Sequence, residues 1–140
     1  MAQSQTWTNT GIAELILLLE GGDASASKLA KIVALNMATA CTAAATSTFA
    51  DPADTATHHT DGGLAIQAID TVSHTTVNTT GDTITFDHVF TATATRNVAG
   101  IHVCNNDGDV TFIECCFNAV IAVENTDTIT IDGQATVDQA

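Results

Sequence analysis

Residues 83–95, TITFDHVFTATAT, decide the fold of this chain because apolar and polar side chains alternate along them. Ile84, Phe86 and Phe90 share one parity with Ala92 and Ala94, whereas threonine and aspartate dominate the other. A period of two places alternate side chains on opposite faces of an extended strand. The stretch therefore predicts a β-strand in an antiparallel sheet with one buried face and one solvent-exposed face.

Three further strands are predicted to follow, at residues 98–104, 110–117 and 127–137. The first two flank residues 105–109, whose Asp-Gly pair readily adopts positive φ, so together they predict a β-hairpin. In the last strand apolar and polar residues alternate again, and Gly133 indicates a bulge or a close backbone approach. A short apolar run at residues 119–123 separates the second of these strands from the third.

The first half of the chain predicts an arm, a helix and two more strands. Residues 1–8 are mostly polar and predict a flexible or docking arm. Residues 29–37 and 64–74 have strand-like patterns, the second with a parity slip near Ile69. Residues 46–63 between them are rich in Ala, Thr and Asp and predict a long surface loop.

The helix is predicted over residues 9–22, where Asn9 or Thr10 can cap the first turn and a glycine pair ends the last. Its apolar residues cover more than one stripe, so we expect it to be buried on two sides or pressed against a partner subunit. Trp7 before it either anchors on a neighbour or caps the core of its own domain. The residues predicted to form an interface are Trp7, Ile12, Leu15, Ile16, Leu18 and Leu19.

These elements favour a mainly β fold, an antiparallel β-sandwich or jelly-roll-like single domain with one short N-terminal helix. A chain of 140 residues with 45% hydrophobic residues can build one core, which we place in a domain over residues 9–140 behind the arm at residues 1–8. Threonine on the strand faces keeps a sheet soluble without charge. Such strands favour a scaffold over an active site.

The chain carries a formal net charge of −13, from 16 acidic and 3 basic residues. Lys28, Lys31 and Arg96 are too few to form a basic patch, which argues against nucleic acid and against an anionic membrane as partners. Self-repulsion of this size is relieved by salt, which favours a protein from a high-salt source. An ordinary acidic secreted or virion protein is the alternative.

The 4 cysteines, Cys41, Cys104, Cys115 and Cys116, lack the Cys-x-x-Cys spacing of zinc and redox sites. We interpret them as small buried side chains rather than disulfide partners, because free cysteine is among the most buried residue types. Adjacent strand residues point to opposite faces, so Cys115 and Cys116 cannot both belong to one face of a sheet. A bridge from Cys104 to Cys115 or Cys116 across the hairpin is the alternative.

The histidines offer no clear catalytic or metal-binding pattern. His58 and His59 are the densest candidate metal ligands, but neighbouring histidines diverge and no second ligand motif accompanies them. His88 lies on the apolar parity of its strand and predicts a core or interface histidine with satisfied hydrogen bonds. His74 and His102 have no recognisable nucleophile or base partner in the sequence. We therefore expect no catalytic, cofactor-binding or metal-binding residues, and no cofactor.

Two short patterns suggest binding or modification. Residues 105–109, Asn-Asn-Asp-Gly-Asp, resemble a calcium loop in composition, but the EF-hand register would place Val103 at the first ligand position. A hairpin turn is therefore the better interpretation. Asn78 begins an Asn-Thr-Thr match to an N-glycosylation acceptor, a pattern short enough to arise by chance.

The order of these segments resembles a family of small structural proteins encoded by tailed double-stranded DNA viruses. The shared order is a short helix, a strand, an Ala/Thr/Asp-rich loop and Thr-rich strands. The ending at residues 117–131 carries the resemblance furthest, because an aromatic residue, an apolar run and an acidic, threonine-containing turn lead into the last strand. The resemblance implies a β-sandwich or jelly-roll-like virion component, and the acidity suits a virus of a halophilic archaeon.

We therefore expect a non-enzymatic virion protein, a decoration, cement or turret component of the head. It would act as a homo-oligomer seated on the major capsid protein or on neighbouring virion proteins. A tail, baseplate or fibre-attachment protein is the first alternative. The second is an extracellular module that binds glycan or calcium through residues 105–109. A hydrolase that uses His58 or His59 ranks well behind these.

Overall fold

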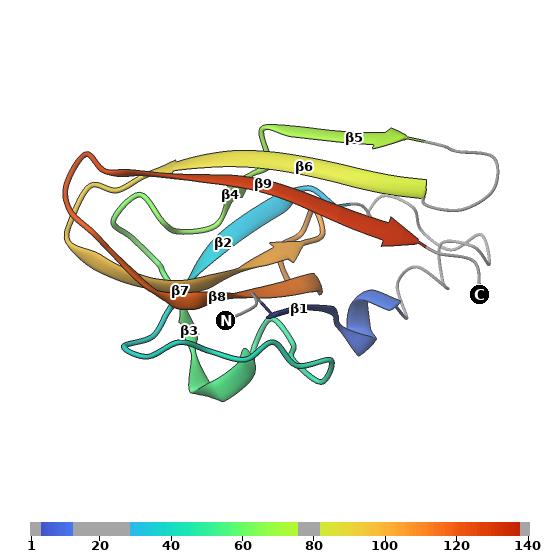
Figure 1. Ribbon diagram of the computed structural model, residues 1–140, viewed down its shortest axis with the longest axis horizontal. Helices are drawn as coiled ribbons and strands as arrows, with labels where there is room; N and C mark the ends of the chain where they lie inside the picture. The colour runs from blue at the N-terminus through green and yellow to red at the C-terminus, as the bar shows by residue number, and fades with distance from the viewer. Residues whose placement is uncertain (1–3, 13–28, 76–81, 138–140) are drawn as a thin grey trace.

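The computed structural model describes residues 4–12, 29–75 and 82–137, and two antiparallel β-sheets make up most of this part (Figure 1). The strands are β1 (Ser4–Trp7), β2 (Lys31–Asn36), β3 (Thr57–His58), β4 (Gln67–Ala68), β5 (Thr71–Thr75), β6 (Asp82–Thr91), β7 (Arg96–Cys104), β8 (Thr111–Val123) and β9 (Thr128–Val137). The larger sheet has the order β1-β8-β7-β2-β3, with β4 also paired to β2, and the smaller has the order β5-β6-β9. The predicted mainly β, sandwich-like fold is confirmed.

The two sheets bury one apolar core between them. Phe86 and Phe90 of β6 meet residues such as Ile101 of β7 there. The predicted period of two is confirmed on β6, because Phe86 and Phe90 are buried whereas Val89 and Thr91 are exposed. The strand ends at Thr91, earlier than the alternation alone indicates.

The predicted hairpin is confirmed, since β7 and β8 pair antiparallel on either side of a turn. Gly108 in that turn has a φ of 75°, as expected for its Asp-Gly pair. The apolar run at residues 119–123 is the second half of β8 and not a separate segment.

The ladder between β7 and β8 contains a large bulge. Val98 pairs with Ile121 but Gly100 pairs with Cys116, so residues 117–120 lie opposite a single residue of β7. A Cβ at Gly100 would lie 2.3 Å from a backbone oxygen of β8, so glycine permits this close approach. The bulge turns part of β8 out of the regular ladder.

The predicted N-terminal arm contains a strand. Ser4–Trp7 form β1, which pairs antiparallel with β8 in a register that places Trp7 beside Ile113. Trp7 is partly buried against the core of its own domain. Of the two roles expected for Trp7, the structure shows packing against the core of its own domain.

A helical turn begins at Asn9, where the helix was predicted to start. Its cap is Thr8 rather than Asn9 or Thr10, because Thr8 Oγ1 accepts a hydrogen bond from Gly11 N at 3.0 Å. Residues 13–22 of the predicted helix lie outside the described residues. Of the described residues, none belongs to a helix that is long and apolar enough to cross a membrane.

Residues 37–63, here called the covering segment, lie between β2 and β4 and include β3, and part of the segment packs on the outer face of the larger sheet. With that sheet they bury a second, smaller core formed by Leu35, Cys41, Ala56, Ala99 and Cys116. The prediction of a plain surface loop at residues 46–63 is corrected, because this stretch contains β3 and the 3-10 helix η1 (Ala53–Thr55) and buries Ser47 and Pro52.

The strand predicted over residues 64–74 is divided between the two sheets. β4 pairs with β2 in the larger sheet, and β5 pairs with β6 in the smaller. The chain crosses between them where Ile69 N donates to Ala30 O at 2.9 Å and Asp70 N donates to Asp87 O at 3.0 Å. The parity slip predicted near Ile69 thus marks a corner of the sandwich.

Candidate functional site

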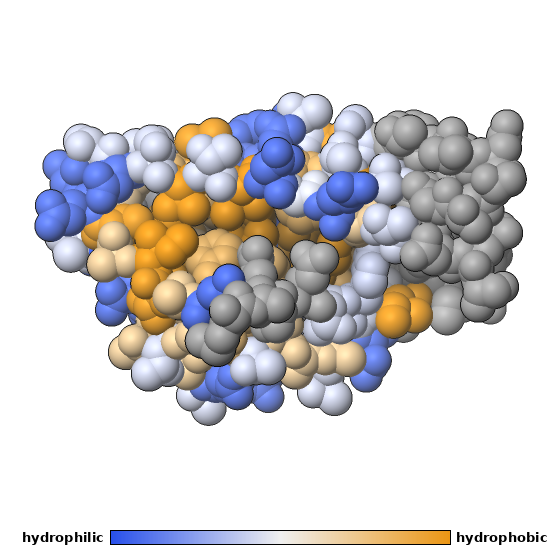
Figure 2. Space-filling model, in the orientation of Figure 1, coloured by the Kyte–Doolittle hydropathy of each residue, from blue (hydrophilic) through white to orange (hydrophobic). Residues whose placement is uncertain are grey.

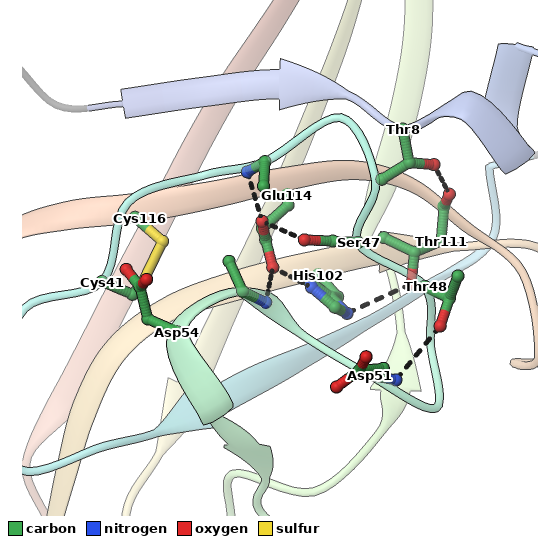
Figure 3. A network of polar contacts seen from close by, with 12 residues as sticks. Thr8, Cys41, Ser47, Thr48, Asp51, Asp54, His102, Thr111, Glu114 and Cys116 are labelled. Atoms are coloured by element: carbon green, nitrogen blue, oxygen red, sulfur yellow. Dashed lines mark hydrogen bonds and ion pairs between the residues drawn. A yellow bond between two sulfur atoms is a disulfide. The ribbon is translucent and has the colours of Figure 1, made fainter.

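A fully buried carboxylate, that of Glu114 on β8, lies between the larger sheet and the covering segment (Figure 3). Glu114 Oε2 accepts hydrogen bonds from Ala44 N and Ser47 Oγ, both at 2.8 Å. Its Oε1 accepts one from Ala53 N at 2.9 Å and lies 2.8 Å from His102 Nε2. One side chain of β8 therefore fixes three positions of the covering segment.

Glu114 is ionised at neutral pH. Burial acts to raise its pKa, but hydrogen bonds from His102, Ala53, Ala44 and Ser47 outweigh burial and lower the pKa to about 2. An ionised carboxylate only accepts hydrogen bonds, so His102 Nε2 is the donor of their contact.

The other nitrogen of His102 faces two further side chains. Nδ1 lies 3.1 Å from Thr111 Oγ1 and 2.9 Å from His58 Nε2. Glu114, His102 and Thr111 thus follow the order carboxylate, imidazole, hydroxyl that hydrolase triads use. All three side chains are buried, however, and Thr111 O also accepts a hydrogen bond from Thr8 Oγ1. We interpret this polar centre as a structural anchor, because its hydroxyl is closed to solvent.

His58 and His59 are adjacent in the sequence but point to different partners. His58 stacks on Phe49 with ring centroids 4.2 Å apart, and His59 Nε2 donates to Asn97 O at 2.9 Å. Burial, reinforced by the nearby His102, lowers the pKa of His58 to about 4, so this ring is neutral at pH 7. Across residues 4–12, 29–75 and 82–137, no three His, Cys, Asp or Glu residues are grouped so as to hold a metal ion.

Cys41 and Cys116 form a disulfide that joins the covering segment to β8 across a sequence separation of 75. The prediction that these cysteines are not disulfide partners is therefore wrong, and the alternative bridge from Cys104 does not form. Cys115 faces the core between the sheets and Cys116 the outer face, which confirms that the two point in opposite directions. Cys104 is a buried thiol as predicted, and burial raises its pKa to about 12.

Asn105 closes the hairpin turn that was weighed as a calcium loop. Its Oδ1 accepts hydrogen bonds from the backbone N–H groups of Gly108, Asp109 and Val110 at 2.9, 3.1 and 3.2 Å. Its Nδ2 donates to Asp109 Oδ1 at 2.8 Å. These polar groups satisfy one another's hydrogen bonds, which favours a hairpin turn over a set of calcium ligands.

His88 is buried on β6, as its parity predicts, with 3% of its surface exposed. The prediction that its hydrogen bonds are satisfied is wrong, because neither ring nitrogen has a hydrogen-bond partner within the described part of the chain. Nδ1 lies 3.2 Å from Asp70 Oδ2, but not in hydrogen-bonding geometry. The ring packs edge-on against Phe90, with centroids 4.4 Å apart.

A groove of about 1060 Å³ opens between the sheets where β9 faces β1 and β8, and we call it the β8–β9 groove. Figure 2 shows apolar side chains in the middle of this face, between more polar rims. The lining residues are Thr6, Trp7, Phe86, Ile101, Ile113, Cys115, Phe117, Asn118, Ala119, Ile121 and residues 129–136. Its accessible lining is about equally polar and apolar, so the groove suits a segment that presents both kinds of side chain.

The edge of β9 forms one wall of this groove. Residues 129–136 border it without a break, so both parities of the strand take part. Because successive side chains point to opposite faces, such a wall includes the strand's edge as well as its inner face. Trp7 and part of the β8 bulge stand on the other side.

The residues predicted to form an interface are only partly described. Trp7 lines the β8–β9 groove, and Ile12 is 43% exposed. The groove itself was not predicted, because it depends on how two sheets of unequal width meet. The predicted residues that lie outside the described ranges are Leu15, Ile16, Leu18, Leu19 and the candidate glycosylation site Asn78.

The described residues thus contain a closed polar centre under the covering segment and an open groove between the two sheets. Comparison with protein-family models, curated proteins and solved structures finds no match for the chain.

Proposed function

We propose that this chain is a non-enzymatic virion structural protein that decorates or cements the outer surface of a viral head. The observation that supports this best is the β8–β9 groove beside a strand edge that no described residue pairs with, a surface suited to another polypeptide. Glu114, His102 and Thr111, whose order resembles that of a hydrolase triad, are instead buried and stabilise the fold. A scaffold with an open groove between its sheets suits a protein that acts by contact.

The disulfide and the charge support a place on the outside of a particle. Disulfides persist in oxidising surroundings, which include virion surfaces, and Cys41–Cys116 is such a bond. A net charge of −13 favours solubility, and concentrated salt screens the self-repulsion that it causes within the folded chain. Both properties fit a protein that sits on the major capsid protein at the surface of a virion from a halophilic host.

Location within the particle tests this role and separates it from the tail, baseplate or fibre alternative. Antibodies against the purified chain would be applied to released particles and imaged with gold labels, and mass spectrometry would identify the chain in the same particles. Gold over the heads is the expected result, whereas gold on the tails would favour the alternative. Purified particles that lack the chain would contradict both.

A further inference from the structure

The free edge of β9 differs from the other sheet edges of the described fold. β9 is 10 residues long and pairs with β6 in an unbroken register. It contains no proline, lysine or bulge, three devices that often protect an edge strand, and its one charged residue is Asp132. By contrast β1 has 4 residues, β5 has 5, and β3 and β4 have 2 each. β9 is therefore a long edge that can accept another strand.

Residues of β1 and β8 line the groove opposite the edge of β9. Among them Ile113 is buried, Trp7 and Phe117 are half-buried, and Ile121 is exposed. Neighbouring strands lie about 4.8 Å apart, so a strand added beside β9 would lie over this groove. Its inward side chains would pack on Trp7, Phe117 and Ile121, which remain partly exposed, and its backbone would pair with β9.

The charge beside this edge indicates what such a strand carries. Asp132 of β9 lies directly opposite Asp87 of β6 in the ladder, and like charges in that position destabilise a sheet. A second copy of this chain carries the same net charge of −13, so the two molecules as a whole repel one another. A lysine or arginine beside Asp132 would instead offset the local repulsion, so charge complementarity favours a basic partner.

We infer that the β8–β9 groove binds an extended segment of a partner protein, which adds a strand to β9, points alternate apolar side chains into the groove and presents a basic residue beside Asp132. This inference rests on the proposed role as a protein that binds other subunits, and it names the surface and the partner's chemistry. Backbone pairing supplies affinity, and the apolar positions set the register. The basic residue makes the groove prefer basic over acidic segments.

Synthetic peptides test the inference on the purified protein. The probe is a ten-residue peptide in which valine alternates with threonine and one central threonine is replaced by lysine. Matched peptides carry glutamate at that position or the same residues in scrambled order. Binding is followed by the fluorescence of Trp7, the only tryptophan, and by amide hydrogen exchange of β9. We expect slower exchange at residues 129–136 and a roughly fivefold preference for lysine over glutamate.

Two charge variants locate the contact. Asp132→Lys should reverse the preference between the lysine and glutamate peptides, because it inverts the charge at the proposed contact. Asp107→Lys changes the net charge equally, but on the exposed hairpin turn, and should leave the preference unchanged. Unchanged circular dichroism of both variants would show that they are folded.

Several results would overturn the inference. They are equal binding of the scrambled peptide, a preference that Asp132→Lys does not alter, no binding of any peptide, or self-association through β9 that the lysine peptide does not displace. Failure here is distinct from failure of the proposed function. Peptides that fail to bind would leave gold labelling of the heads intact, and a chain missing from particles would leave peptide binding intact.

Discussion

Glu114 on β8 and His102 on β7 are register partners, and Glu114 Oε1 lies 2.8 Å from His102 Nε2 with both side chains fully buried. Burying such groups costs desolvation free energy, which is recovered only if their hydrogen bonds are satisfied. The covering segment supplies the remaining donors, so sheet and segment stabilise one another. This explains why a stretch rich in Ala, Thr and Asp is ordered over the sheet.

Glu114→Gln should lower the free energy of unfolding by about 3 kcal/mol, because the amide nitrogen cannot accept the hydrogen bonds that the carboxylate now receives. Glu124→Gln changes an exposed side chain and should alter it by less than about 0.5 kcal/mol. Urea unfolding followed by circular dichroism measures both. Equal, small effects of the two variants would show that the polar centre does not anchor the covering segment.

Stability should fall as the pH is lowered from about 6.5 to about 4, the usual and the folded pKa of His58. In that range the unfolded chain binds a proton at His58 that the folded chain does not, so acid favours unfolding. Glu114 adds a second loss between about 4.5 and about 2, because its folded pKa is also depressed. Urea midpoints in high salt should therefore depend less on pH between 6.5 and 4 in His58→Gln, and an unchanged slope would contradict this assignment.

Removing the disulfide with Cys41→Ala and Cys116→Ala should destabilise the protein by about 4 kcal/mol. The reason is that the unfolded chain gains conformational entropy when a loop closed over a sequence separation of 75 is opened. Cys104→Ala, which removes a buried thiol but no disulfide, should cost about 1 kcal/mol. Thermal unfolding of the three proteins, with peptide mapping of the oxidised one, provides the comparison. A wild-type melting temperature that reductant leaves unchanged would argue against a stabilising bond.

His88→Leu should stabilise the protein by about 1 kcal/mol, because it removes two buried nitrogens that lack hydrogen-bond partners in the described structure. His59→Leu is the matched control and should destabilise it, since that ring donates to Asn97 O. Chemical unfolding at pH 7 measures both variants. Clear destabilisation by His88→Leu would show that the contact with Asp70 is favourable in the native state.

The alternation of apolar and polar residues predicted the β-sheet fold. It did so most reliably where one face of a strand is exposed to solvent. Phe86 and Phe90 reveal their strand because threonine alternates with apolar residues around them. The bulge in β8 could not be predicted in this way, because it depends on the close approach that Gly100 permits between two paired strands. The prediction of one strand over residues 64–74 was wrong, because the only sign of a corner between two sheets in the sequence is a slip in the alternation of apolar and polar residues.

The polar centre was missed because its members are distant in the sequence. Glu114 within an apolar run was the available signal, since charged residues are rarely buried without partners. The predicted hairpin also implied that His102 and Glu114 lie near one another, but their register depends on the exact turn. Cys41 gave no such signal, because its segment has no clear period, and only the packing of the covering segment brings it to Cys116.

We propose that the chain acts by binding a subunit of a different protein along β9. The most direct measurement replaces Gln134, exposed on β9, with a photoreactive phenylalanine analogue, with Asn106 on the hairpin turn as the matched position. After irradiation of assembled particles, we predict that the analogue at position 134 cross-links to a different polypeptide through a segment that contains lysine or arginine, and that position 106 does not. Cross-links from position 106 alone, or from position 134 only to further copies of this chain, would contradict the claim.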